Sequence, residues 1–191
     1  MTAEPTDELI DDPSIYAGRF VGLRPVTTGD YDFLFVLFNH PGQVLRTRLA
    51  GLSIAPEDFP KFLWDGVLCQ YLITRLDNRQ PVGLVAAYNA DVRNGHVALA
   101  AYTDPQYNGK GWPLEGVLLA IRLLFRNHPF NKIYMESPAY TFSQFGSGSD
   151  RLFEQEGVLK DHFYLRNKRW DMHILAVYRD TAERELPRLL P

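Results

Sequence analysis

The feature of this sequence that most constrains its fold is a change of hydrophobic period in the middle of the chain. Residues 70–76, 81–89 and 96–103 alternate between apolar and polar side chains and are separated by short polar turns. They are followed by a segment of helical periodicity that begins at Trp112 or Pro113 and ends at Asn127. Alternation is typical of strands, and apolar residues that recur every three or four positions are typical of helices. The middle of the chain therefore predicts a three-stranded meander that leads into one long helix.

The flanking segments extend this pattern on both sides. Further strands are expected at 19–26, 132–137, 158–165 and 170–178, and further helices after Asp30, after Pro56 and at 139–146. The last two strands are close enough in sequence to pair as a hairpin. This order of strands and helices predicts one mixed sheet with helices on both faces.

Length and composition are those of one globular domain. The chain has 191 residues, of which 46% are apolar, and can bury a core without disulfides or structural metal. We expect an acidic leader at 1–17, a single domain at 18–179 and a C-terminal tail at 180–191. The net charge of -3 argues against a broad basic surface for nucleic acid. The single cysteine, Cys69, excludes a disulfide within the chain and a cysteine-rich zinc site, and its apolar neighbours predict a buried thiol.

No segment of the sequence resembles a targeting signal or a membrane anchor. The first residues are acidic and lack the apolar stretch of a secretory signal. The longest apolar run, Val117–Phe125, contains Arg122 and is far too short to cross a bilayer. We therefore expect a soluble, cytoplasmic protein that binds neither a membrane nor nucleic acid.

The strongest functional signal is the junction between the third alternating segment and the long helix. Two glycines, Gly109 and Gly111, follow the strand and immediately precede the helix. Glycine tolerates positive φ and lets a ligand approach the backbone, while the first turn of a helix offers free N–H groups and the positive end of its dipole. With Lys110 between the glycines, the junction suits an anion such as a pyrophosphate. The alternative is that both glycines serve only as turn and cap residues.

Three motifs, in the right order along the chain, carry a resemblance to a known family. Gln106–Gly111 is similar to the Gln/Arg-x-x-Gly-x-Gly/Ala acyl-CoA loop of the GNAT N-acyltransferase superfamily and lies where that family has it. The segment 23–27 with Asp30, and the segment 153–159 followed by Asp171, resemble the ribosomal-protein N-terminal acetyltransferase branch. The resemblance implies an α/β (α+β) fold with a mixed, mostly antiparallel central sheet flanked by helices on both faces.

The resemblance also implies an acyl-CoA thioester, most often acetyl-CoA, as co-substrate, and no metal. In this family the pantetheine arm binds the exposed edge of the fourth strand, and the pyrophosphate binds the amides of the glycine loop. The corresponding residues here are Ala101, Tyr102 and Thr103 at the edge, and Tyr107, Asn108, Gly109, Lys110, Gly111 and Trp112 in the loop. Physical reasoning agrees, because an open strand edge offers unpaired N–H and C=O groups to a peptide-like ligand.

The general base is harder to assign, because the strand 96–103 lacks the glutamate that this family often places there. Three other residues are candidates, namely Glu136, His96 and His173. Each of them could instead be structural, and no base is needed if the amine arrives neutral. Glu156 and Asp171 follow the branch motif, and we expect them to be structural.

The general acid has two candidates after the fifth predicted strand. The branch pattern falls on Ser143, which would reach the CoA sulfur, although the asparagine that precedes it in the family is absent. Tyr140 is the rival, since other members use a tyrosine of this helix as acid. The competing reading is that the helix merely packs Tyr140 and Phe142 on the core.

The sequence therefore predicts an enzyme, an acyl-CoA-dependent N-acyltransferase that moves acetyl to a primary amine of a small molecule. One alternative is a catalytically silent acyl-CoA-binding module that acts as a sensor or partner subunit. Another is an acetyltransferase whose acceptor is a protein N-terminus. We expect a monomer or a homodimer.

Overall fold

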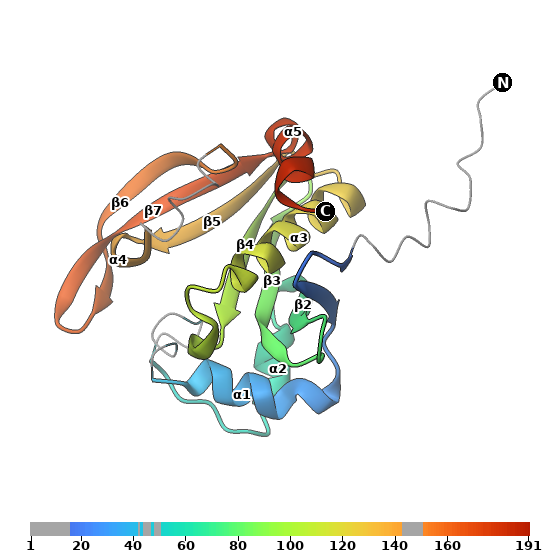
Figure 1. Cartoon of the computed structure of the whole chain (residues 1–191). Coiled ribbons are helices and arrows are strands. Elements are labelled where there is room, and N and C mark those ends of the chain that lie inside the picture. The colour runs from blue at the N-terminus through green and yellow to red at the C-terminus, as the bar shows by residue number, and fades with distance from the viewer. Residues whose placement is uncertain (1–15, 42, 44–46, 48–50, 143–150) are drawn as a thin grey trace.

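The structure is a computed structural model and describes residues 16–41, 43, 47, 51–142 and 151–191 (Figure 1). Its strands are β1 (Val21–Pro25), β2 (Val67–Arg75), β3 (Pro81–Asp91), β4 (His96–Thr103), β5 (Lys132–Pro138), β6 (Glu154–Leu165) and β7 (Lys168–Tyr178). Its helices are α1 (Tyr31–Asn39), α2 (Phe59–Trp64), α3 (Trp112–Asn127), α4 (Ala139–Phe142) and α5 (Arg179–Leu189), with short 3-10 turns η3 (Thr28–Asp30) and η4 (Pro105–Tyr107).

The seven strands form one sheet in the order β1-β2-β3-β4-β5-β7-β6. Every neighbouring pair is antiparallel except β4 and β5, which run parallel. The parallel pair follows from the connection, because α3 carries the chain back to the starting end of the sheet before β5 begins. The predicted order of elements from β1 to β7 and the mixed, mostly antiparallel sheet are confirmed.

Each face of the sheet carries its own hydrophobic core. Leu84 and Val85 are consecutive on β3 and therefore point to opposite faces. Val85 belongs to the larger core, which includes residues of α3 and α5, while Leu84 belongs to a second core that includes residues of α1 and α2. We refer to these sides as the α3 face and the α1 face. The prediction of helices on both faces is confirmed.

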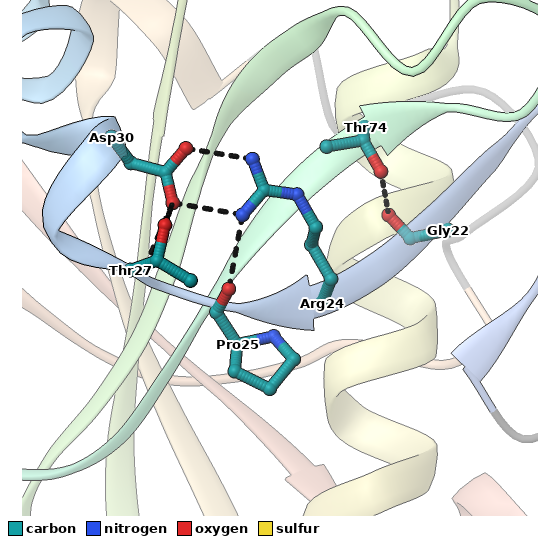
Figure 2. Close-up of polar contacts among 6 residues, drawn as sticks. All are labelled: Gly22, Arg24, Pro25, Thr27, Asp30 and Thr74. Carbon is teal, nitrogen blue, oxygen red and sulfur yellow. Dashed lines mark hydrogen bonds and ion pairs between the residues drawn. The ribbon is translucent and has the colours of Figure 1, made fainter.

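An ion pair fixes the entry from β1 into α1 (Figure 2). Arg24 Nη2 donates to Asp30 Oδ1 at 2.6 Å, and Arg24 Nη1 donates to Oδ2 at 2.8 Å. The backbone N–H and the hydroxyl of Thr27 also donate to Oδ2, at 2.8 and 2.9 Å. The guanidinium, helped by Thr27, lowers the pKa of Asp30 to about 2 although the side chain is buried. The segment 23–27 with Asp30, which resembles the GNAT branch, therefore has a structural role at the start of α1.

The C-terminal segment 180–191, which the sequence reading separated as a tail, is part of the folded domain. It forms most of α5, whose buried residues Ala182 and Leu186 pack in the core beside α3. Arg179 anchors the start of this helix, since its guanidinium donates to the carbonyl oxygens of Phe125, His128 and Phe130 at 2.6–2.8 Å. In the part of the chain that the structure describes, no helix is both long and apolar enough to cross a membrane.

Candidate functional site

The central feature of the site is a split between β4 and β5. The two strands are paired at only three positions, from His96 opposite Lys132 to Ala98 opposite Tyr134. Beyond Ala98, β4 continues to Thr103 paired only with β3, and β5 continues to Pro138 paired only with β7. The two groups of strands accordingly fan apart in Figure 1. The last five residues of β4 thus present one strand edge to the split.

The direction of the backbone groups along this edge can be derived from one hydrogen bond. The N–H of Asp104 donates to the carbonyl of Val82 on β3 at 2.9 Å. Because backbone groups of alternate residues point to the same neighbouring strand, those of Tyr102 point to β3. Those of Ala101 and Thr103 therefore point into the split. Of the three edge residues predicted from the sequence, these two can offer main-chain hydrogen bonds to a ligand there.

A buried glutamine already touches this edge. Gln43 lies between α1 and α2, and its Nε2 donates to the carbonyl of Thr103 at 2.7 Å. Its side chain is buried. This contact confirms that the Thr103 carbonyl faces away from β3. Sequence reasoning missed Gln43, because it lies 60 residues from Thr103 and no local pattern connects the two.

The glycine loop follows directly after the edge. Gly109 and Gly111 have φ values of 76° and 75°, and a Cβ added at either position would meet no atom within 4 Å. Both glycines are therefore required by backbone conformation, and the space beside them is open. Asp104 accepts hydrogen bonds from the backbone and side chain of Gln106 at 3.0 and 2.7 Å, which makes it a turn former as its position before Pro105 indicated.

The six loop amides assigned from the sequence divide into two groups. Those of Tyr107, Asn108 and Lys110 donate to carbonyls within the loop at 3.0–3.2 Å. Those of Gly109, Gly111 and Trp112 have no acceptor in the described part of the chain. The second group lies at the N-terminus of the 16-residue helix α3, where the dipole favours an anion.

The charges around the loop also favour an anion. Lys110 Nζ lies 5.0 Å from the centre of the Trp112 ring. The guanidinium of Arg75, which is ion-paired with Asp77, lies 4.8 Å from the same ring. Glu115 in the first turn of α3 is turned away, because its carboxylate accepts the backbone N–H groups of residues 19–21. The arrangement can bind a diphosphate group on the loop while a peptide-like chain lies along Ala101 and Thr103.

A pocket of about 420 Å³ lies on the α1 face where β4 and β5 meet, and we call it the split pocket. Its polar and aromatic lining residues are Tyr88, Asn89, His96, Tyr134, Glu136 and Glu156, and Ala98 also lines it. Glu136 lies two residues beyond Tyr134, the last residue of β5 that pairs with β4, and thus at the mouth of the split. The structure brings two candidate bases, Glu136 and His96, into this one pocket.

The third candidate base is held elsewhere. His173 neighbours Ile174, which lines the split pocket, and therefore points to the opposite face of β7. Its ring stacks on Phe142 at 4.0 Å, and its Nδ1 lies 2.7 Å from Gln155 Oε1.

The two candidate acids differ in what the structure describes. Tyr140 follows directly after β5, on α4, and its ring lies 5.1 Å from Trp170 and 6.1 Å from Phe163 on the hairpin β6–β7. These contacts agree with the packing role considered for this helix, in which Phe142 also packs against the larger core. Ser143 lies outside the described residues.

The remaining family-like residues make structural contacts. Glu156 on β6 accepts hydrogen bonds from Lys132 Nζ at 2.9 Å and from the Tyr178 hydroxyl, and these contacts, Tyr178 first, lower the pKa of Glu156. Asp171 accepts hydrogen bonds from Lys160 Nζ at 2.7 Å and from the backbone N–H of Asp161 at 3.0 Å. Cys69 is half-buried, and burial raises the pKa of its thiol.

No protein-family model and no curated protein matches the chain in sequence. Its structure is similar to spermidine N-acetyltransferase from Vibrio cholerae in complex with CoA and spermine, with a TM-score of 0.74 and 16% identity over 85% of this chain and 98% of that chain. It is also similar to an acetyltransferase of the GNAT family from Bacillus anthracis, with a TM-score of 0.68 and 13% identity over 86% of this chain and 98% of that one. The fold expected from the sequence is therefore confirmed, and the chain has the GNAT fold.

Proposed function

We propose that this protein is an acyl-CoA-dependent N-acyltransferase that moves acetyl from acetyl-CoA to a primary amine of a small molecule. The observation that carries the proposal is the continuity of two binding features. The strand edge at Ala101 and Thr103 runs directly into the loop whose open amides are those of Gly109, Gly111 and Trp112. A peptide-like pantetheine joined to a diphosphate has the same order of chemical groups. The GNAT-fold structure that contains CoA and spermine supports this reading.

The chemistry assigned to the site is one acyl transfer. The amine nitrogen attacks the thioester carbonyl, so that a C–N bond forms and the C–S bond breaks. The amine loses a proton to Glu136, directly or through water, and the leaving sulfur takes a proton from Ser143 or Tyr140. Glu136 supports this role because it lies at the mouth of the split and lines the split pocket.

A second candidate function is a CoA-binding module without chemistry. It is favoured by the composition of β4, which contains no carboxylate between His96 and Thr103. An acetyltransferase for protein N-termini would share the donor site and differ only in the acceptor.

The experiment that separates these functions measures thiol release from acetyl-CoA in the presence of a panel of primary amines and short peptides. The proposed enzyme releases free thiol only when an amine is present and forms the matching N-acetyl product. Saturable acetyl-CoA binding without thiol release would support the binding module. Absence of any acetyl-CoA binding would refute both.

A further inference from the structure

A second pocket, of about 530 Å³, lies between the C-terminal half of α3 and α5, and we call it the helix pocket. The two helices lie side by side on the α3 face of the sheet (Figure 1). The apolar residues that line the helix pocket are Phe125, Ala182, Leu186, Pro187, Leu190 and Pro191. All of them except the two prolines are buried, so they form the floor of the pocket. A mostly apolar lining with a few polar groups is typical of sites for small organic molecules.

The charged lining of the helix pocket is positive. It consists of Arg122, Arg126, Arg179 and Glu183, so three guanidinium groups face one carboxylate. Glu183 Oε1 lies 3.8 Å from Arg179 Nη1, which offsets the charge of that one arginine. The chain as a whole has a net charge of -3, so a positive lining is unusual on its surface. An anionic ligand complements the helix pocket better than a neutral or cationic one.

The three arginines differ in the contacts that they already make. Arg179 donates to three backbone carbonyls, and Arg122 donates to the carbonyl oxygens of Ala17 at 3.2 Å and of Pro191 at 3.3 Å. Arg126 lies four residues after Arg122 and therefore on the same side of α3. Its side chain is exposed and makes neither an ion pair nor a hydrogen bond within the part of the chain that the structure describes. Arg126 can therefore bind an anion without losing an existing partner.

We propose that the helix pocket binds an aliphatic carboxylate of the fatty-acid class, with its carboxylate at Arg126 and its chain on the floor formed by Phe125 and Leu186. Burial of methylene groups on this floor favours binding, and the charged hydrogen bonds at the rim select an anion. The helix pocket is separate from the proposed acyl-CoA site. Arg126 lies fifteen residues beyond Gly111, which corresponds to about 22 Å along α3. The two ligands can therefore bind at the same time.

Calorimetric titration of the wild-type protein at neutral pH with octanoate, octan-1-ol and octylammonium tests the proposal. Each titration is carried out with and without saturating CoA. We expect octanoate to bind at least about ten-fold more tightly than the other two compounds, which have the same chain length, and to do so equally in both conditions. Equal affinities of the three compounds, or no saturable binding of octanoate up to about 10 mM, overturn the proposal.

The CoA condition separates this inference from the proposed function. Octanoate binding that CoA abolishes would place octanoate in the acyl-CoA site and overturn the proposal. Octanoate binding to a protein that does not bind CoA would support the helix pocket and count only against the proposed function.

Two substitutions at the rim should change the octanoate affinity in opposite directions. Arg126→Gln should lower it by about three-fold or more, and Glu183→Gln, which removes the carboxylate of the lining, should raise it by a similar factor. Both side chains are exposed, so both variants should fold, and their melting temperatures check this. The control Arg166→Gln removes an exposed arginine on the turn between β6 and β7 and should leave the affinity unchanged.

Two results for these variants would overturn the proposal. One is an octanoate affinity that stays the same in Arg126→Gln. The other is absence of octanoate binding together with a dimer, seen by sedimentation, that Arg126→Gln dissociates, because the helix pocket would then be covered by a second copy of the chain.

Discussion

Replacement of Asp30 by asparagine should destabilise the protein at neutral pH and much less in acid. The carboxylate accepts two hydrogen bonds from Arg24 and two from Thr27, and Asp30→Asn removes its charge (Figure 2). The folded pKa of about 2, compared with 3.8 for the free side chain, corresponds to at most about 2.4 kcal/mol of stabilisation. Water screens part of this attraction because the Arg24 side chain is 39% exposed, so we expect about 1.5 kcal/mol.

The stabilisation by the Asp30 carboxylate should depend on pH. The folded pKa lies below the unfolded one, so the stabilisation is complete above about pH 5 and is lost as the pH falls through about 2. Urea unfolding at pH 7 and pH 3 should therefore show a difference between wild type and Asp30→Asn that falls to roughly half at pH 3. Asp32→Asn, an exposed acid in the next turn, should change the unfolding free energy by about 0.5 kcal/mol or less. A difference that stays constant between the two pH values would refute the reasoning.

The remaining predictions concern the loop, the C-terminal helix and the candidate acids. Gly111→Val should abolish the rise in melting temperature caused by acetyl-CoA, because the valine side chain would enter the open space beside the loop. The control Gly66→Val, at a similar φ of 66° and with equally open surroundings, should retain this rise in melting temperature. Arg179→Met should lower the unfolding free energy by about 2–3 kcal/mol, because three carbonyls lose a charged donor, whereas Arg166→Met on an exposed turn should have little effect. Ser143→Ala should lower turnover by roughly ten- to a thousand-fold with little change in acetyl-CoA affinity, and if Tyr140→Phe has this effect instead, the acid is Tyr140.

The sequence predicted those parts of the fold that depend on local pattern. The meander and the long helix follow from hydrophobic period, and Gly109 and Gly111 could be read as positive-φ positions because they lie at a strand-to-helix junction. The helix α5 was missed. Ala182 and Leu186 of α5, and Leu190 directly after it, are apolar and recur every four positions. Pro187 and the many charged residues argued against a helix, which packing against α3 stabilises.

The candidate site was predictable in part, and the limit was strand register. Alternation alone indicates that Tyr134 and Glu136 share a face of β5. Only the register of β4 against β5 shows that pairing stops at Ala98 and that Glu136 therefore lies at the mouth of a split. The pairing of β4 with β3 also shows that the backbone N–H and C=O groups of Ala101 and Thr103 point into the split, whereas those of Tyr102 point to β3. Long-range contacts such as Gln43 to Thr103 leave no local signal in a single sequence.

Residue-resolved amide hydrogen exchange with and without acetyl-CoA tests the central claim most directly. We expect acetyl-CoA to slow exchange at the amides that face the split or lie open in the loop, namely those of Ala101, Thr103, Gly109, Gly111 and Trp112. The amides of Tyr102, Asn108 and Lys110 provide internal controls, because they point to β3 or already donate within the loop, and they should change little. Protection of the first group and not of the second is the predicted result. Unchanged exchange in both groups at saturating acetyl-CoA, or equal protection of both, would contradict the account.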